Sequence, residues 1–220
     1  MSLKIISYLQ LVINEQSHLQ KGMNYRVKNK NYSVILMSVE KNAPYKDEIL
    51  DDGKIKYEGH DVYRDKNKKK IDQTLKDDNG KFMKSVDDFK NNMNNPDKVR
   101  VYRKIRPSVW VDMGFYNLID GYREVSNSRK VFKFILDPIM SDDTTGESIS
   151  DLLHDRHIPG EVMREVFDRD GGKCVICGSK DNLHLDHKVP FSKGGSSKDP
   201  KNIQLLCARH NLKKGNKLLY

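Results

Sequence analysis

The sequence has only three cysteines and one tryptophan among its 220 residues. Because an odd number of cysteines leaves one unpaired, a disulfide framework does not account for them. No apolar stretch reaches the roughly 18 residues that a membrane helix needs. The first 20 residues also lack the basic start, apolar centre and small-residue cleavage site of a secretory signal. We therefore expect a cytoplasmic protein without a membrane partner.

Basic residues outnumber acidic ones, with 40 Lys and Arg against 31 Asp and Glu, which gives a net charge of +9. This balance favours a polyanionic partner such as nucleic acid and disfavours an acidic one. Ten Tyr, seven Phe and several Val, Ile and Leu runs are enough for modest hydrophobic cores. The length suits one large domain or two small ones, and we expect two.

The three cysteines lie together in the last quarter of the chain. Two residues separate Cys174 from Cys177, and two separate Cys207 from His210. This is the spacing of two knuckles that hold one tetrahedral ion, and thiolates with one imidazole favour zinc over magnesium or calcium. We predict a structural Zn²⁺ site in a reducing compartment. Three unrelated buried thiols and a surface histidine are the alternative.

Five runs rich in β-branched and aromatic residues, bounded by turn signals, predict strands in the first 140 residues. They are residues 32–39, 54–58, 99–101, 115–125 and 131–136. A looser helical pattern covers residues 72–93, with Asn79-Gly80 as a candidate interruption.

Residues 138–159 have little apolar content and several turn residues, which predicts a linker. A short helix over Val162–Phe167 follows it and leads into the cysteine segment. The predicted organisation is a first domain over residues 1–138, a linker over 139–158 and a second domain over 159–220.

The second domain carries a series of motif residues in a fixed order between and after the knuckles. They are Asp186-His187, Pro190, Gly194-Gly195, Asn202 and Asn211-Leu-Lys-Lys-Gly215. Inside the zinc frame, this order makes residues 164–217 resemble the HNH nucleases, whose compact unit is two strands and a helix around a metal. The resemblance covers about a quarter of the chain and implies a ββα-metal HNH domain with structural zinc knuckles.

The residue types fit phosphodiester hydrolysis. A base must make water nucleophilic, and a neutral imidazole with a pKa near ~6.5 can do so, which points to His187. A hard cation needs oxygen ligands that leave water sites open, and Asp186 and Asn211 would supply them for Mg²⁺ or Mn²⁺. By the resemblance, Asn202 holds the imidazole by a side-chain hydrogen bond that fixes its tautomer.

Three further assignments in this segment stay open. His184 shares a strand face with Asp186, so it either touches the site or is a strand histidine with a local partner. His210 and Asn211 are adjacent, and their roles at zinc and at the catalytic ion can be exchanged. The basic residues near the C-terminus either contact DNA phosphate or form a solvated helix face. These are Lys213, Lys214 and Lys217.

The first domain also contains an ordered series of motif residues. They are Tyr32-Ser-Val-Ile-Leu36, Tyr45 to Asp47, Tyr57-Glu-Gly59, Asp72-Gln73, Leu75, Val99 to Arg103, Tyr116, Tyr122 and Phe132-Lys-Phe134. This order resembles the SRA domain, the SET- and RING-associated reader that flips modified cytosine out of DNA, over about half of the chain. It implies an SRA/PUA-like curved β-sheet barrel with helices, so the predicted fold class of the whole chain is α+β.

In the SRA family two tyrosines twelve residues apart sandwich the flipped base, and Tyr45 and Tyr57 have this separation. A carboxylate then accepts a hydrogen bond from the cytosine N4 amine. Glu48 stands where the family has Asp, and Asp47 is the neighbour that could replace it. Glu58 replaces a small hydroxyl residue, which leaves 5-methylcytosine, 5-hydroxymethylcytosine or a bulkier base open. The alternative for the tyrosine pair is ordinary core packing.

Together the two resemblances indicate a modification-dependent restriction endonuclease that binds double-stranded DNA carrying modified cytosine, flips the base and cuts nearby. Because one HNH site cuts one strand, we expect a homodimer on DNA. Two rival functions stay open. One is a sequence-specific HNH endonuclease that reads unmodified DNA, and the other is a non-catalytic reader of modified DNA that keeps the zinc module for structure.

Overall fold

The structure is a computed structural model, and it describes residues 2–19, 21–40, 43–62, 71–139 and 157–217. The chain forms two compact units. Unit 1 comprises Met1–Leu11, Lys104–Met113 and Thr144–Tyr220, and unit 2 comprises Val12–Arg103 and Gly114–Asp143. Helices and strands are mixed along the chain, which confirms the α+β class. Among the described residues, no helix has the length and apolar character to cross a membrane.

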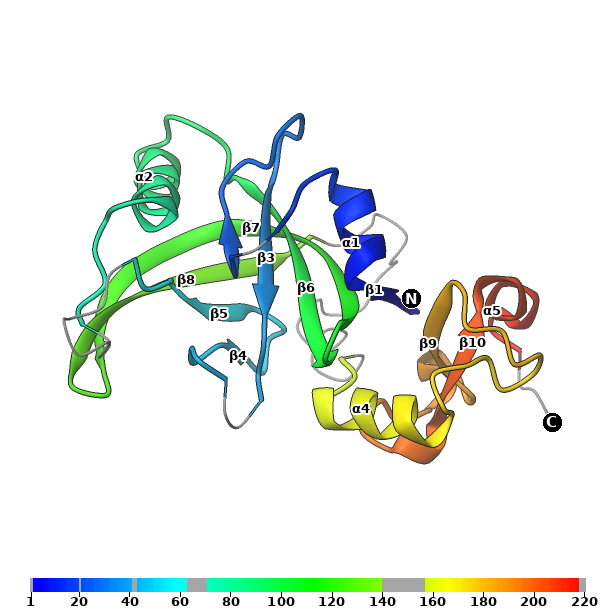
Figure 1. Cartoon of the computed structure of the whole chain (residues 1–220). Coiled ribbons are helices and arrows are strands. Elements are labelled where there is room, and N and C mark those ends of the chain that lie inside the picture. Colours follow the sequence, from blue (N-terminus) through cyan, green and yellow to red (C-terminus); the bar gives the residue numbers. More distant parts are fainter. Residues whose placement is uncertain (1, 20, 41–42, 63–70, 140–156, 218–220) are drawn as a thin grey trace. The chain divides into compact units, whose positions relative to one another are not determined.

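Unit 2 is built on a sheet whose strands come from most of the predicted segments (Figure 1). Strand β3 (Ser33–Met37) pairs in parallel with β6 (Lys98–Arg106) and antiparallel with β2 (Met23–Asn24). The long strands β7 (Val109–Ser126) and β8 (Arg129–Pro138) form an antiparallel pair. All five predicted strands are confirmed, although β6, β7 and β8 are longer than the apolar runs that signalled them.

The residues predicted to read the base lie on or directly before two short strands of unit 2. Strand β5 (Ile55–Glu58) pairs antiparallel with β8, placing Tyr57 opposite Phe134 and Glu58 opposite Lys133. Strand β4 (Glu48–Ile49) pairs antiparallel with β5. Glu48, Tyr57 and Glu58 therefore lie in one sheet, and residues 45–47 directly precede β4.

Two helices belong to the first part of the chain. Helix α2 (Asp78–Lys90) begins six residues later than predicted, because Asp77 has a φ of 59° that ends the preceding irregular segment. Its buried Phe82 contacts the ring of Phe134 edge to face, with centroids 5.5 Å apart. Helix α1 (Tyr8–Glu15) was not predicted. It ends on Glu15, which is fully buried and accepts a hydrogen bond from the Tyr32 hydroxyl at 2.9 Å.

Unit 1 contains the whole segment that resembles an HNH nuclease. Strands β9 (Leu183–His187) and β10 (Ile203–Cys207) pair antiparallel, and helix α5 (Ala208–Lys214) follows directly. Helix α4 (Gly160–Arg169) confirms the predicted helix over residues 162–167. The 3₁₀ turns η1 (Phe191–Lys193) and η2 (Pro200–Asn202) lie in the loop between β9 and β10. The predicted linker lies almost wholly outside the described residues.

A strand from the beginning of the chain completes this unit. Strand β1 (Leu3–Ser7) pairs antiparallel with β9, with Leu3 opposite Leu185, and also with β7, where Lys4 lies opposite Asp112. Its Ile5 joins the buried cluster of α4, β9 and β10. Although β1 belongs to the predicted first domain, it packs as part of unit 1.

Candidate nuclease and base-reading sites

The four predicted zinc ligands converge. The ligand atoms of Cys174, Cys177, Cys207 and His210 all lie within 4.8 Å of one another. The Nδ1 atom of His210 is 3.4 Å from both the Cys174 and Cys207 sulfurs, and the Cys177 and Cys207 sulfurs are 3.9 Å apart. A tetrahedral zinc would require S···N edges of about 3.5 Å and S···S edges of about 3.8 Å. The cluster is therefore compatible with zinc.

The charge state of Cys174 fits the same role. Burial raises the pKa of its thiol, but hydrogen bonds from the backbone of Cys207, Cys177 and Ile176 outweigh burial and lower the pKa to about 6. A thiolate is the form that binds a metal ion. Cys174 thus favours the ligand form before any ion is bound, whereas the neighbouring sulfurs of Cys174 and Cys207 raise the pKa of Cys177.

Two glycines shape the loop between β9 and β10. Gly194 ends η1 in the left-handed region, with a φ of 81°, where glycine carries no steric cost. At Gly195 a Cβ atom would lie 1.8 Å from the carbonyl oxygen of Val189, so no larger residue fits. Gly194 is thus required for its backbone conformation, and Gly195 for the close approach of the Val189 carbonyl.

Asn202 closes this loop through backbone contacts. Its Oδ1 accepts from the Val189 N–H at 2.9 Å, and its Nδ2 donates to the carbonyls of Val189 and Ser196 at 3.1 and 3.0 Å. We predicted a hydrogen bond from Asn202 to the imidazole of His187. The contacts of its amide instead hold the loop, because both N–H groups are engaged by backbone carbonyls.

The imidazole of His187 is oriented by Ser197, which the sequence analysis missed. The Nε2 atom of His187 lies 2.8 Å from the Oγ of Ser197, whose side chain is buried. When Nε2–H donates to this hydroxyl, Nδ1 is the ring nitrogen that can accept a proton. Ser197 follows Ser196 in the loop that Asn202 closes, so Asn202 is linked to His187 through this loop. A serine that closely follows two glycines is typical of an ordinary turn, so the sequence does not indicate that Ser197 contacts His187.

Two side chains hold the carboxylate of Asp186. Its Oδ2 accepts from the Lys214 ammonium at 3.1 Å and from the Gln204 amide at 3.3 Å. The Lys214 side chain is only 1% exposed. Lys214 is therefore unavailable to a DNA phosphate in this arrangement, in contrast to the exposed Lys213 and Lys217. Burial of the stem and pairing of the ammonium with Asp186 explain the difference.

Asn211 and His184 are joined through the beginning of the chain. The Nδ2 of Asn211 donates to the Ser2 Oγ at 2.7 Å, and the same oxygen is 3.2 Å from the Nδ1 of His184. Burial, followed by the nearby charge of Lys4, lowers the pKa of His184 from its usual value. His184 thus has Ser2 as a partner, and through Ser2 it is linked to the predicted ligand Asn211.

In unit 2, the predicted base-reading residues lie near one another but differ in exposure. Tyr45 is half-buried, and its hydroxyl accepts from the Asp61 N–H at 3.3 Å. Tyr57 is 1% exposed. Burial, and then the charges of Asp47, Tyr45 and Glu58, raise the pKa of Tyr57 well above its usual value. Tyr57 is therefore packed in the core, whereas Tyr45 is not.

The two candidate carboxylates differ in burial. Glu48 is exposed on β4. Asp47 is buried, and its two oxygens accept from the backbone N–H groups of Glu58 at 3.1 Å and Ser38 at 3.3 Å. Burial raises the pKa of Asp47 to about 7 despite these bonds. Asp47, rather than Glu48, is the carboxyl that faces the protein interior beside Tyr57.

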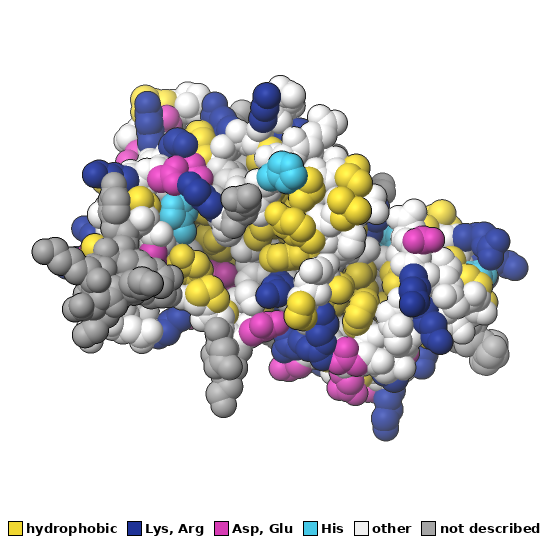
Figure 2. Space-filling model, viewed as in Figure 1, with side chains coloured by type: hydrophobic (Ala, Val, Ile, Leu, Met, Phe, Trp, Pro, Cys, Tyr) yellow, Lys and Arg dark blue, Asp and Glu magenta, His cyan; other side chains and the backbone are white. Residues whose placement is uncertain are grey.

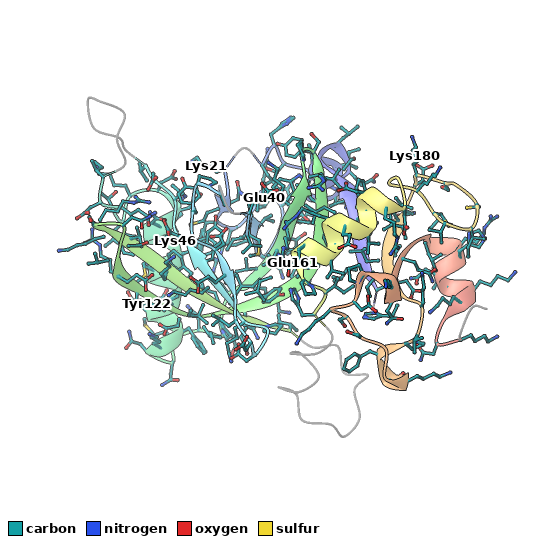
Figure 3. All side chains as sticks on the ribbon, turned by 90° about the horizontal axis from the view of Figure 1, so that it is seen from below. Lys21, Glu40, Lys46, Tyr122, Glu161 and Lys180 are labelled. Atoms are coloured by element: carbon teal, nitrogen blue, oxygen red, sulfur yellow. The ribbon has the colours of Figure 1, made fainter. Side chains whose placement is uncertain are left out.

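A buried ion network supports the segment that carries Tyr45 and Asp47. Glu58 pairs with Lys133 at 2.9 Å and with Arg129 at 3.1 Å. The backbone of Lys46, labelled in Figure 3, is held on both sides: its N–H donates to Glu58 and its carbonyl accepts from Lys133. Glu58 thus fixes the loop that carries Tyr45 and Asp47.

Basic side chains are spread over the molecular face in Figure 2, with acidic side chains among them. The net positive charge of the chain is therefore not concentrated in a single patch on this face.

Comparisons with known proteins place the C-terminal segment. Residues 174–217 match the family model described as HNH endonuclease. No curated protein matches the chain. Among solved structures, the SUVH5 SRA domain in complex with hemi-methylated CG DNA is 22% identical, with 62% of this chain and 86% of that chain covered and a TM-score of 0.46.

Two further solved structures give similar values. The SUVH5 SRA domain bound to fully hydroxymethylated CG DNA has the same identity, coverage and TM-score. SUVH9 is 18% identical, with 76% of this chain and 32% of that chain covered and a TM-score of 0.43. Residues 174–217, which match the HNH endonuclease model, include Asp186, His187, Asn202 and Asn211.

Proposed function

We propose that the chain is a modification-dependent DNA endonuclease that reads a modified cytosine with unit 2 and hydrolyses a nearby phosphodiester with the HNH segment of unit 1. The observation that carries the proposal is the arrangement of His187. Its Nε2 is bonded to a buried Ser197 in a loop closed by Asn202, inside a segment that matches the HNH endonucleases.

The nuclease chemistry follows from this arrangement. With Nε2–H donated to Ser197, the Nδ1 of His187 takes the proton of the attacking water. Asp186 on β9 and Asn211 on α5 would hold Mg²⁺ or Mn²⁺, which supplies charge stabilisation to the scissile phosphate and the departing oxygen. Exposed Lys213 and Lys217 would contact neighbouring phosphates.

The knuckle ligands have a different task. Cys174, Cys177, Cys207 and His210 would hold a structural zinc, because four protein ligands leave no open position for substrate. The donor sets agree with this division: thiolates and imidazole select zinc, whereas carboxylate and amide oxygens select a hard cation.

In unit 2, a flipped base would stack on the half-buried Tyr45 and present its N4 amine to Asp47. Asp47 is buried away from water, where a hydrogen bond from an amine is strengthened. Tyr57 would complete the stack only if its ring becomes uncovered when DNA binds. Stacking at about 1–3 kcal/mol per base can offset the cost of flipping.

The biological role that fits this chemistry is the restriction of foreign DNA that carries 5-methyl- or 5-hydroxymethylcytosine. Each chain has one proposed nuclease site, so cutting both strands of a duplex requires two chains. We therefore propose a homodimer on DNA.

The proposal is tested by incubating the full chain and Mg²⁺ or Mn²⁺ with one plasmid in unmodified, 5-methylcytosine and 5-hydroxymethylcytosine forms. His187→Ala is the blank. We expect the wild-type protein to cut only the modified plasmids. We expect His187→Ala to cut none of the three. Tyr45→Ala should lose this selectivity, whereas Tyr122→Ala, at an exposed tyrosine of β7, should keep it.

Two other outcomes support the rivals. Cutting of unmodified plasmid at discrete sites, with Tyr45→Ala no worse than Tyr122→Ala, indicates a sequence-specific endonuclease. Binding of modified DNA without any cutting, equal in wild type and His187→Ala, indicates a non-catalytic reader.

A further inference from the structure

We propose that Ser2 is a positioning residue of the nuclease site, whose hydroxyl turns the side-chain amide of Asn211 so that its oxygen faces the catalytic ion. This inference rests on the proposed function, because it takes Asn211 as an oxygen ligand. Ser2 stands directly before β1, and the pairing of Leu3 with Leu185 on β9 brings it to the module.

The hydrogen bonds around Ser2 have a direction. Asn211 Nδ2 lies 2.7 Å from the Ser2 Oγ and can only donate, so the serine oxygen accepts. The single hydroxyl proton of Ser2 is then available for the Nδ1 of His184, 3.2 Å away. Asn211 therefore donates to Ser2, and Ser2 donates to His184. The nitrogen of the Asn211 amide is the end that takes part.

The orientation of the amide decides whether Asn211 can bind a cation. The two ends of an asparagine amide have almost the same shape, but only the oxygen is a ligand for Mg²⁺ or Mn²⁺. With Nδ2 held by Ser2, Oδ1 is the end of the amide that the serine does not engage. Without the serine hydroxyl, the flipped amide, with its N–H groups toward the ion, becomes accessible.

Strand β1 makes Ser2 a rigid partner. It is paired along both edges, since Lys4 lies opposite Asp112 of β7 and opposite His184 of β9. A serine fixed by a doubly paired strand loses little further entropy when it holds the amide. The arrangement thus gives the first residues of the chain a direct effect on a site more than 200 residues away in sequence.

The test measures Mn²⁺ binding to the full, zinc-loaded chain without DNA by calorimetry, with Asp186→Asn to identify the site. Ser2→Ala should weaken Mn²⁺ binding by about three- to tenfold, the effect of one lost hydrogen bond. Ser2→Thr keeps the hydroxyl and should bind like wild type. Ser192→Ala, at an exposed serine of η1, is the matched control, and thermal unfolding confirms that each variant is folded.

The decisive comparison uses Asn211→Asp. A carboxylate has two equivalent oxygens, so its orientation needs no selection, and Ser2→Ala should have almost no effect on Mn²⁺ affinity in this background. An equal loss in both backgrounds would mean that Ser2 only supports α5 and would overturn the inference. Unchanged Mn²⁺ affinity in Ser2→Ala alone overturns it as well.

Cleavage separates this inference from the proposed function. In plasmid nicking, Ser2→Ala should raise the half-saturating Mn²⁺ concentration while the rate at saturation changes little. If wild type binds Mn²⁺ through Asp186 but cuts no plasmid, the proposed function fails and the effect of Ser2 on binding stands. If wild type binds no Mn²⁺ at this site, both fail.

Discussion

The ammonium of Lys214 is paired with the carboxylate of Asp186 at 3.1 Å, although both side chains are almost completely buried. The pair brings a fixed positive charge to the carboxylate that is proposed to hold a divalent cation. Because breaking one side of a buried pair leaves an uncompensated charge, Lys214→Met should lower the free energy of unfolding by about 3 kcal/mol without divalent ions.

Addition of Mn²⁺ should restore more stability to Lys214→Met than it adds to wild type, since the ion then neutralises Asp186 without a competing ammonium. Urea unfolding with and without Mn²⁺ measures both effects. Lys213→Met, at the exposed neighbour, is the control and should change neither. An equal loss with and without Mn²⁺ would contradict the proposed role of Asp186.

Ser197 orients the base, so its removal should act on the rate of the chemical step and leave DNA binding unchanged. Ser197→Ala should lower the single-turnover cleavage rate by roughly ten- to a hundredfold, as expected for a residue that supports a functional side chain. Ser197→Thr, which keeps the hydroxyl, should recover part of the rate.

Binding and stability measurements distinguish this role from a general loss of structure. Because the Ser197 hydroxyl contacts the imidazole of His187, Ser197→Ala should keep the wild-type affinity for modified duplex and the wild-type melting temperature. Ser192→Ala serves as the control. A reduced rate accompanied by weaker DNA binding and lower thermal stability would indicate that Ser197 acts only on loop packing.

The sequence was informative where spacing determines geometry. The four zinc ligands and the two strands and helix of the HNH segment follow from short motifs, and the structure brings the ligands together. The strands of unit 2 were predicted from their apolar runs. Their ends were not, because pairing with a neighbouring strand extends β6, β7 and β8 into polar sequence.

What escaped prediction depends on contacts between distant residues. Helix α1 carries a glutamate that reads as solvated, yet Glu15 is buried against the hydroxyls of Tyr32 and Tyr102. Strand β1 acquires its partner from the other end of the sequence, through Leu185. The roles of Ser2 and Ser197 and the burial of Lys214 were missed for the same reason. Each depends on a contact with a loop or strand that no local sequence pattern predicts.

Removal of zinc should unfold unit 1 and leave unit 2 folded. The buried Cys174 and Cys207 belong to the core of unit 1, so loss of the ion disrupts packing as well as the knuckles. Trp110, the single tryptophan of the chain, lies opposite Ile6 of β1 in that unit, with its indole Nε1 buried. Its fluorescence should shift to longer wavelength when a chelator removes the zinc.

Zn²⁺, but not Mg²⁺, should reverse this shift, and most of the far-ultraviolet strand signal should persist throughout. Metal analysis of the purified chain should give one zinc per chain. A chain without zinc that keeps the tryptophan emission of the loaded form would exclude a structural zinc.

Recognition of modified DNA should weaken as the pH falls through 7. Burial raises the pKa of Asp47 to about 7, so the carboxyl is ionised above this pH and protonated below it. The ionised form accepts the stronger hydrogen bond from the cytosine N4 amine. The ratio of affinities for modified and unmodified DNA should therefore drop about three- to tenfold between pH 8 and pH 6.

Fluorescence anisotropy without divalent ions, on one duplex in both forms, measures this ratio and cancels the pH dependence of general phosphate binding. Asp47→Asn should give a low ratio at every pH, whereas Glu48→Gln, at the exposed neighbour, should follow wild type. A ratio that depends on pH equally in wild type and Asp47→Asn would assign the reading of the base to another group.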